Sequence, residues 1–564
     1  MNGAEVLVNT LCEEKVEYVF GLAGVGIGGI FSSLYDHKDI ELISTRHEQV
    51  AAGMADGYGR AKGRPGVCVV GGGPGTTNAI IGIANALRDY SPVVAFTGDQ
   101  VFEELGRGIF HELDQMAMFK PITKWSTLLK TPEDIHRIVR TAFIRANTGR
   151  PGPIHINLHQ DIIGREADPK LIEKQKPADS YISDFVRPDP KGVKKAASLI
   201  LSSNNPVIIA GEGILWSDGS LKLLELAELL HIPVVVNALS RGVIPEDHAL
   251  CLGLVGRWGL ETARRAVREA DLVLGIGCRF SDLTTVKWTL INDEAKIVQV
   301  DIDPNEIGNQ YPVDVGLVSS SRAFIEELID DLVKHGIRDG SKFRDSSLIK
   351  ALQQERKEEL DALFGASNNE SPIRRGQLVK EIRETLDRNA LIFLGGGLHA
   401  DYATNMLAYE PKTLFKSAGF GAMGMPFPQA LGGKLACPDR QVVAIDGDGS
   451  FAMVSQDLET AVRHHIGAVV IVCNDYSFAS IKSSQPKGRN IGVDYSNPDF
   501  AKLAELYGAQ GARVEKPEEI GPALKRLLDS GEPGVLDVIV EPLEPSPTRW
   551  DYRNRSAILR DLKS

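Results

Sequence analysis

Short runs of β-branched and aliphatic residues recur along the chain, each followed by a glycine-containing turn and then by a segment with helical spacing of apolar positions. Such alternation predicts parallel sheets with helices packed on both faces. The pattern therefore indicates an α/β fold built from doubly wound parallel-sheet domains. In the first third of the chain we expect strands at 18–21, 41–44, 66–70, 93–97 and 154–158.

Two polar, proline-containing stretches, 165–191 and 339–372, interrupt this rhythm and are typical of interdomain linkers. Charge spacing around 351–363 predicts an exposed helix inside the second stretch. The predicted domains are 1–165, 186–335 and 370–545, followed by a tail of mixed charge at 546–564.

The charge balance and cysteine content of the chain argue against several classes of partner and location. The chain has 63 basic and 75 acidic residues, a net charge of −12 without a long single-sign run, which disfavours nucleic acid or an anionic membrane as its partner. Its start lacks a leader pattern, no stretch is apolar enough to span a bilayer, and the six cysteines form no C-x-x-C pair. We therefore expect a cytoplasmic protein with reduced thiols.

The strongest chemical signal lies in the third domain. An apolar strand at 441–445 leads into Gly447-Asp448-Gly449-Ser450, before a helix expected at 452–464, and a second strand at 468–473 ends in Asn474-Asp475-Tyr476-Ser477. Asp-Gly and Asn-Asp alone are common turn residues. The two acids, 27 residues apart, would however meet at neighbouring strand ends. We expect Asp448, Asp475 and Ser477 to bind Mg²⁺, and Gly447, Gly449 and Ser450 to contact a diphosphate.

In this pairing the chain resembles the thiamine diphosphate-dependent enzymes, whose fingerprint is Gly-Asp-Gly followed, after a helix and a strand, by Asn-Asn or Asn-Asp. The resemblance implies that the three domains are pyrimidine-binding, central and diphosphate-binding. It also implies a role for Glu48, which precedes a small-residue helix at 50–61. A carboxylate there would share a proton with the aminopyrimidine ring of the cofactor. Taken alone, Glu48 is also a typical helix N-terminal acid.

The resemblance covers nearly the whole chain. The loop from Gly72 to Asn78, Gly-Gly-Pro-Gly-Thr-Thr-Asn, is similar to the Ser-Gly-Pro-Gly-Ala-Thr-Asn loop of acetolactate synthases, which makes Pro74 and Asn78 candidate cofactor contacts. His399 stands where the family has Gly-Gln-His near the diphosphate. Met423 matches the bulky residue that bends the two cofactor rings into a V, although an isolated methionine is usually core filler.

The resemblance further implies an oligomer. Glu48 of one subunit would reach the cofactor held by Asp448 and Asp475 of another, in a homodimer or homotetramer with sites at the subunit interface.

Motifs near position 111 leave the reaction open. The closest likeness is to acetolactate synthase, which implies cleavage and ligation of carbon–carbon bonds on a 2-oxo acid. His111 replaces the glutamine of the synthase Phe-Gln-Glu and becomes a candidate acid/base, with His47 and His399 as further proton carriers. Ser484 falls where synthases have a substrate-selecting tryptophan.

Other features favour different classes of protein. Glu-Leu-Asp-Gln-Met at 112–116 resembles oxalyl-CoA decarboxylase and 2-hydroxyacyl-CoA lyase, so a CoA-thioester lyase or decarboxylase acting on an acyl-CoA stays an alternative. A nucleotide-binding oxidoreductase would explain the glycine turns but not Glu48. A non-catalytic cofactor-binding subunit would not need that acid.

The central domain gives weak support for FAD. Flavin-carrying synthases have Gly-Met-His-Gly where this chain has Gly256-Arg257-Trp258-Gly259. Arg257 could pair with a phosphate, such as that of a CoA nucleotide, or stack on Trp258. The aromatic and basic tail at 546–564 could fold over the active site or be a disordered end.

Overall fold

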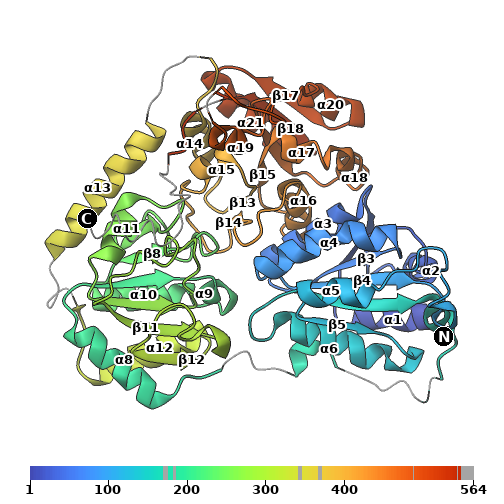
Figure 1. Cartoon of the computed structure of the whole chain (residues 1–564), viewed down its shortest axis with the longest axis horizontal. Helices are drawn as coiled ribbons and strands as arrows, with labels where there is room; N and C mark the ends of the chain where they lie inside the picture. Colours follow the sequence, from blue (N-terminus) through green and yellow to red (C-terminus); the bar gives the residue numbers. More distant parts are fainter. Residues whose placement is uncertain are drawn as a thin grey trace.

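The computed structural model describes residues 1–168, 170, 176–181, 186–340, 346–365, 371–486, 488–542 and 544–547. These residues contain three six-stranded sheets in which neighbouring strands run parallel, and helices cover both faces (Figure 1). The α/β prediction is confirmed. Each sheet lies within one predicted domain, while the domain boundaries stay predictions; the tail from 548 onward lies outside the described residues.

The N-terminal sheet has the order β2-β1-β3-β4-β6-β5. The five expected strands are present, and β5 is an addition: its residues are only half-buried at the sheet edge, so no apolar run marks it. The strands are β1 (Tyr18–Leu22), β2 (Glu41–Ser44), β3 (Gly66–Val70), β4 (Val93–Asp99), β5 (Trp125–Leu128) and β6 (Ile154–His159). The helices are α1 (Gly3–Glu13), α2 (Gly28–Asp36), α3 (Glu48–Lys62), α4 (Pro74–Arg88), α5 (Gln115–Phe119), α6 (Ile135–Asn147) and α7 (Gln160–Gly164).

The central sheet has the order β12-β11-β10-β7-β8-β9. Its strands are β7 (Pro206–Ala210), β8 (Val234–Val236), β9 (Cys251–Leu254), β10 (Leu272–Ile276), β11 (Lys296–Asp301) and β12 (Val315–Val318). Its helices are α8 (Pro190–Ser202), α9 (Gly213–Trp216), α10 (Ser220–Leu230), α11 (Glu261–Arg268) and α12 (Ser321–Lys334). The long helix α13 (Ser346–Phe364) runs along the outside toward the third domain and confirms the helix expected at 351–363 (Figure 1).

The C-terminal sheet has the order β14-β13-β15-β16-β18-β17. Its strands are β13 (Leu391–Leu394), β14 (Leu414–Lys416), β15 (Val442–Gly447), β16 (Val469–Asn474), β17 (Gln510–Val514) and β18 (Gly534–Ile539). Its helices are α14 (Arg375–Thr385), α15 (Leu398–Ala403), α16 (Pro426–Ala436), α17 (Asp448–Phe451), α18 (Leu458–Arg463), α19 (Ala479–Ser484), α20 (Phe500–Tyr507) and α21 (Pro517–Ser530). The chain direction across the sheet reverses between β13 and β15, which is where doubly wound sheets bind ligands.

The single helix predicted at 452–464 is wrong. Helix α17 begins at Asp448 itself, and α18 follows only after a separate turn. In that turn the Asp457 carboxylate accepts the backbone N–H of Arg46 at 2.7 Å and the Thr460 hydroxyl at 2.9 Å. The chain bends here because Asp457 binds the N-terminal domain, a contact that helical periodicity cannot reveal.

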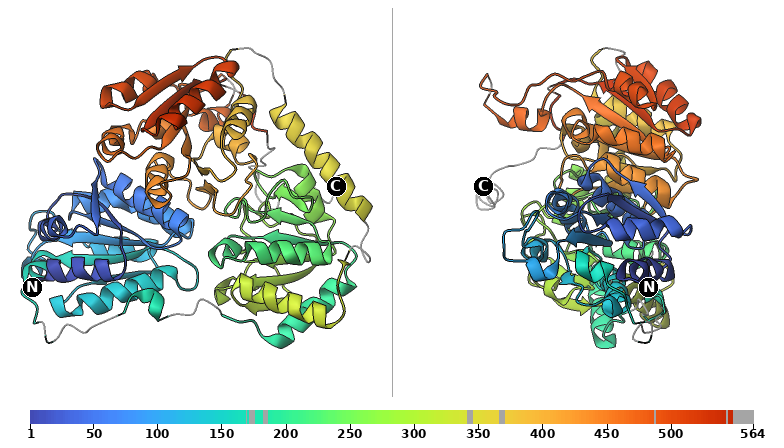
Figure 2. Two further views of the ribbon diagram at one scale, coloured as in Figure 1. Left: turned by 180° about the vertical axis from the view of Figure 1, so that it is seen from behind. Right: turned by 90° about the vertical axis from the view of Figure 1, so that its right-hand side faces the viewer.

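Helices α3 and α16 join the N-terminal and C-terminal domains, which lie side by side in both views of the front and back (Figures 1 and 2). Glycines allow their backbones to approach closely: a Cβ at Gly57 would lie 2.0 Å from the carbonyl oxygen of Gln429, and one at Gly432 would lie 2.0 Å from that of Met54. A shared hydrophobic core crosses this boundary. Glu48, at the start of α3, is therefore anchored to the C-terminal domain.

In the part of the chain that the structure describes, no helix has the length and apolar character needed to cross a membrane.

Candidate active site

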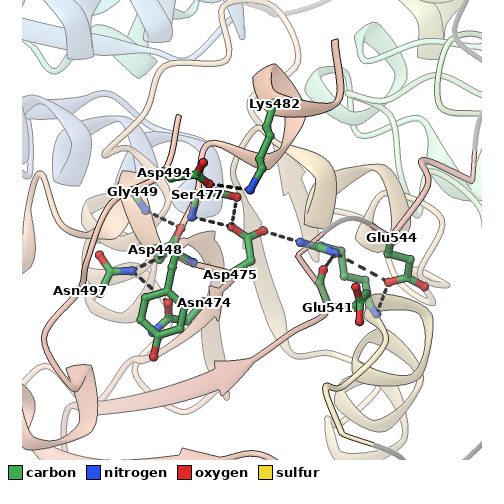
Figure 3. Close-up of polar contacts among 12 residues, drawn as sticks. Asp448, Gly449, Asn474, Asp475, Ser477, Lys482, Asp494, Asn497, Glu541 and Glu544 are labelled. Atoms are coloured by element: carbon green, nitrogen blue, oxygen red, sulfur yellow. Dashed lines mark hydrogen bonds and ion pairs between the residues drawn. The ribbon is translucent and has the colours of Figure 1, made fainter. Parts of the chain in front are cut away.

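Asp448 and Asp475 follow neighbouring strands of the C-terminal sheet. Gly447 at the end of β15 is in register with Cys473 near the end of β16, so both carboxylates emerge at the same sheet edge. The backbone N–H of Tyr476 donates to Oδ2 of Asp448 at 2.8 Å. Figure 3 shows Asp475 between Asp448 on one side and Glu541 and Glu544 on the other. The two acids form one polar cluster.

Asp448 is buried and surrounded by donors. Its Oδ1 accepts from the backbone N–H of Gly449 and the hydroxyl of Tyr495, both at 2.8 Å. Besides Tyr476, its Oδ2 accepts from Nδ2 of Asn497 at 2.8 Å. Burial raises the pKa of Asp448, and these hydrogen bonds oppose the rise. Sequence reasoning missed Tyr495 and Asn497, which lie on a loop almost fifty residues away.

Asp475 is held between a loop and a buried arginine. Its Oδ1 accepts the backbone N–H and the hydroxyl of Ser477, each at 3.0 Å, and its Oδ2 accepts from Nη2 of Arg375. Burial raises the pKa of Asp475 to about 6, although Arg375 favours the ionised form. The Ser477 hydroxyl is thus engaged by Asp475. The main-chain carbonyl of Ser477 is the oxygen of this residue that could hold a cation.

Within the described ranges, no group of three or more acidic, histidine or cysteine side chains is arranged to hold a metal ion. A cation at this site would therefore bind Asp448, Asp475, main-chain oxygen and the oxygens of a ligand. That donor set of hard oxygens suits Mg²⁺.

His399 lies in the crevice between the ends of β13 and β15. A Cβ at Gly397 or at Gly447 would lie 3.1 Å from its Cε1 atom, so a side chain at either position would crowd this ring. The ring is buried, and its Nε2 has no hydrogen-bond partner among the described residues. Burial lowers the pKa of His399 to about 3, which makes it a neutral hydrogen-bonding group rather than the proton carrier considered from the sequence.

The loop that carries Met423 is tied to both domains. Ser450 accepts the backbone N–H of Gly424 at 2.7 Å and donates to Oδ2 of Asp446 at 2.9 Å. Nε2 of Gln49 donates to the carbonyl oxygens of Met423 at 3.1 Å and Gly424 at 3.3 Å. The Ser450 hydroxyl thus positions this loop, and Met423 itself is half-buried beside the first turn of α3.

Glu48 is the first residue of α3, and its carboxylate faces the start of α4. Oε2 accepts from Nδ2 of Asn78 at 3.0 Å, and a Cβ at Gly75 would lie 2.9 Å from Oε1. Pro74 begins α4, where its missing N–H costs no helical hydrogen bond. His47 is the N-cap of α3, and its Nδ1 accepts the backbone N–H of Gln49 at 3.1 Å.

His111 projects from a loop next to the start of α4. It has φ +68°, and its ring stacks on Phe110 with centroids 3.8 Å apart. A Cβ at Gly73 would lie 2.8 Å from that of His111, so the two loops are in close contact. Its Nδ1 is buried and unpaired within the described structure. The neighbouring Glu112 orders this loop by accepting the backbone N–H groups of Gly106, Gly108 and Ile109.

The central domain leaves little space beside Trp258. The Arg257 guanidinium lies 5.2 Å from the centroid of the Trp258 ring, as in the stacking alternative considered above. The cavity lined by Trp258, Arg279 and Glu212 measures about 20 Å³, which holds one or two water molecules. A larger cavity of about 580 Å³ lies between the N-terminal and central domains and is lined by residues of both.

Comparison with known proteins gives consistent matches along the chain. Family models of the thiamine pyrophosphate enzymes match the N-terminal TPP binding domain at 1–118, the central domain at 193–328 and the C-terminal TPP binding domain at 395–538.

Similar proteins are found in bacteria and archaea. A probable acetolactate synthase large subunit of Methanocaldococcus jannaschii is 37% identical over 97% of this chain and 93% of its own length. The acetolactate synthase large subunit of Haemophilus influenzae is 34% identical, over 93% of this chain and 92% of its own. That of Mycobacterium tuberculosis is 32% identical, over 96% and 88%.

Proposed function

Since this chain belongs to the thiamine pyrophosphate enzyme family, we propose that it is an acetolactate synthase-like enzyme that uses thiamine diphosphate and Mg²⁺. It would decarboxylate a 2-oxo acid and join the remaining fragment to another carbonyl compound. The observation that carries this proposal is the pair of carboxylates, Asp448 and Asp475, beside the unpaired Nε2 of His399 at the ligand-binding edge of the sheet. The names of the relatives favour an oxo acid over an acyl-CoA substrate.

The residues present fit the cofactor. Asp448, Asp475 and the Ser477 carbonyl would hold Mg²⁺, and His399 would donate to a phosphate oxygen with the backbone N–H groups at the start of α17. When bound, thiamine diphosphate supplies the carbon nucleophile and electron sink needed to cleave a bond next to a carbonyl.

Glu48 would hold the proton that is shared with the aminopyrimidine ring. Asn78 fixes Oε2 of the carboxylate, and Gly75 leaves space for Oε1. Gln49, the next residue, binds the loop that carries Met423 of the same chain, so one helical turn would connect the proton-sharing acid of one site with the bulky side chain that shapes the cofactor in the other site.

His111 would transfer a proton to or from the substrate. Its ring lies on the Gly73 loop next to the start of α4, and its buried Nδ1 is unpaired among the residues described. A neutral imidazole can serve as donor or acceptor at that atom.

We propose a homo-oligomer with the active site between subunits. Within one chain the carboxylate of Glu48 contacts Asn78 of its own domain, and that of Asp448 contacts residues of the C-terminal domain. A two-fold arrangement that places Glu48 of one subunit against Asp448 and Asp475 of its partner would give two equivalent sites per dimer.

For FAD, we propose that none is bound, because Arg257 and Trp258 replace the Met-His of flavin-carrying synthases and lie against each other, 5.2 Å from guanidinium to ring centroid. The visible spectrum of the purified protein after incubation with FAD and removal of excess ligand tests this. A stoichiometric flavin absorbance would contradict it.

Substrate assays test the proposed reaction. The purified protein, supplied with thiamine diphosphate and Mg²⁺, should release CO₂ from pyruvate or a related 2-oxo acid and form a ligated product detectable by mass spectrometry. Oxalyl-CoA and a 2-hydroxyacyl-CoA serve as competing substrates, and glyoxylate is tested as a further 2-oxo acid. Turnover of a CoA thioester without turnover of any 2-oxo acid would contradict the proposal.

A further inference from the structure

Arg375 carries a positive charge that is withdrawn from solvent directly beside a candidate metal ligand. Its side chain is 1% exposed, at the first position of α14. Nη2 donates to Oδ2 of Asp475, and Nη1 donates to the carbonyl oxygen of Glu541. A guanidinium stays protonated in proteins, so this charge is permanent.

The neighbouring acid, Glu544, has further partners. It accepts the backbone N–H of Arg375 at 2.6 Å and a hydrogen bond from Nε of Arg374 at 3.3 Å, whereas its nearest approach to the Arg375 guanidinium is 3.8 Å. Asp475 therefore has the closer charged contact with Arg375. Figure 3 shows Glu541 and Glu544 on the side of Asp475 that faces away from Asp448.

This arrangement changes the electrostatic binding energy of a free cation at the site. Two ionised carboxylates in a buried place attract a divalent ion strongly, but an adjacent guanidinium repels it and already balances the charge of Asp475. A multiply charged diphosphate experiences the opposite effect, because the same guanidinium attracts it.

We infer that Arg375 makes the site select the metal together with the diphosphate rather than the free metal. The inference rests on the proposed function, because it takes Asp448 and Asp475 as the cation ligands. Arg375 is thus a positioning residue that sets the relative affinity for two ligands without touching either reacting group.

Binding measurements test the inference without an activity assay. Mn²⁺ affinity in the absence of cofactor is measured by the electron paramagnetic resonance signal of the free ion. Thiamine diphosphate affinity is measured at saturating Mn²⁺ by calorimetry. In Arg375→Met we expect Mn²⁺ alone to bind at least about tenfold more tightly, because the repulsion is lost, and thiamine diphosphate at least about tenfold more weakly, because the attraction is lost. Each tenfold change corresponds to about 1.4 kcal/mol of binding free energy.

Arg375→Gln separates charge from hydrogen bonding and also serves if the methionine variant does not fold. Glutamine can still donate to Asp475 but has no charge. As in Arg375→Met, Mn²⁺ alone should therefore bind more tightly and thiamine diphosphate more weakly. Arg374→Met is the matched control, because Arg374 is 46% exposed and pairs with Glu544. It should leave both affinities unchanged.

Two outcomes would overturn the inference: Arg375→Gln binding both ligands as the parent does, or both affinities falling together, which a purely structural role would produce. Failure of the proposed function is distinguishable, because the parent protein would then bind no thiamine diphosphate at saturating Mn²⁺.

Discussion

Asn78 donates a hydrogen bond from Nδ2 to Oε2 of Glu48 across 3.0 Å. The bond joins Asn78, in the second turn of α4, to the first residue of α3, so the carboxylate lies near the N-termini of both helices. In the proposed reaction this is the acid that shares a proton with the cofactor, and its placement depends on the small residue at position 75.

Gly75→Ala should impair catalysis with little effect on folding. The added Cβ would lie 2.9 Å from Oε1 of Glu48, so the carboxylate must move away from its present position. We expect kcat to fall by roughly 10²-fold, the lower range for removal of a general acid or base, while the unfolding temperature changes little. Gly164→Ala is the control, since a Cβ there meets nothing within 4 Å. Equal rates for both variants would contradict the role of Gly75.

His399→Ala should weaken cofactor binding. The lost group is a buried Nε2 that lacks a partner within the described residues and that we assign to a phosphate oxygen. Hydrogen bonds to charged groups contribute about 1.5–3 kcal/mol, so Kd for thiamine diphosphate should rise by about 10- to 100-fold in a fluorescence titration. His335→Ala removes an exposed histidine at the end of α12 and should have no effect. An unchanged Kd in His399→Ala would place the diphosphate elsewhere.

Removal of the metal should abolish activity. In Asp448→Asn, more Mg²⁺ should be needed to restore activity. Dialysis against a chelator is expected to stop turnover, and Mg²⁺ to restore it. Asp448→Asn should need at least about 10²-fold more Mg²⁺ for half-maximal activity, because one anionic ligand is lost. Asp494→Asn changes an exposed acid that precedes Tyr495 and pairs with Lys482, and it should respond to Mg²⁺ as the parent does. Full activity in the presence of chelator would refute a metal role.

Asp89 should make unfolding pH-dependent. It is 3% exposed, lies 3.6 Å from Nη1 of Arg60 and accepts the backbone N–H of Gly419 at 2.7 Å. Burial, with a smaller contribution from the nearby Asp56, raises the pKa of Asp89 from 3.8 to about 6, whereas Arg60 opposes the rise. The folded protein therefore holds this proton more tightly than the unfolded chain, and Asp89 lowers stability as pH rises from about 4 to about 6.

The test compares Asp89→Asn with the parent between pH 4.5 and 7.5. Over this range the unfolding free energy of the parent should fall relative to the variant by about 2 kcal/mol. Asp439→Asn, at an exposed position, should follow the parent at every pH. A difference between Asp89→Asn and the parent that stays constant with pH would show that Asp89 does not titrate in this range.

Much of this architecture could be predicted from the sequence, because parallel strands and their turns leave local patterns. The strands of the first sheet were predicted, except β5, whose half-buried edge position gives no apolar run. Asp448 and Asp475 were placed together because the carboxyl ends of successive parallel strands share one sheet edge.

The contacts that shape the site could not be predicted in this way. Arg375 binds Asp475 from a hundred residues away, and Tyr495 binds Asp448 from a distant loop. Neither contact has a spacing or periodicity in the sequence, because tertiary packing alone brings these groups together. The same reason explains the error at 452–464, where Asp457 binds the N-terminal domain instead of continuing a helix.

The most direct test of the account uses mixed dimers. Glu48→Gln and Asp448→Asn chains, each expected to be nearly inactive alone at the lowest Mg²⁺ concentration that saturates the parent, are given different affinity tags, mixed by co-expression and purified through both tags. If Glu48 of one subunit completes the metal site of the other, each mixed dimer contains one intact site and should show about half of the parental activity. Mixed dimers no more active than either variant alone would contradict the claim that Glu48 and the Asp448–Asp475 site work together across subunits.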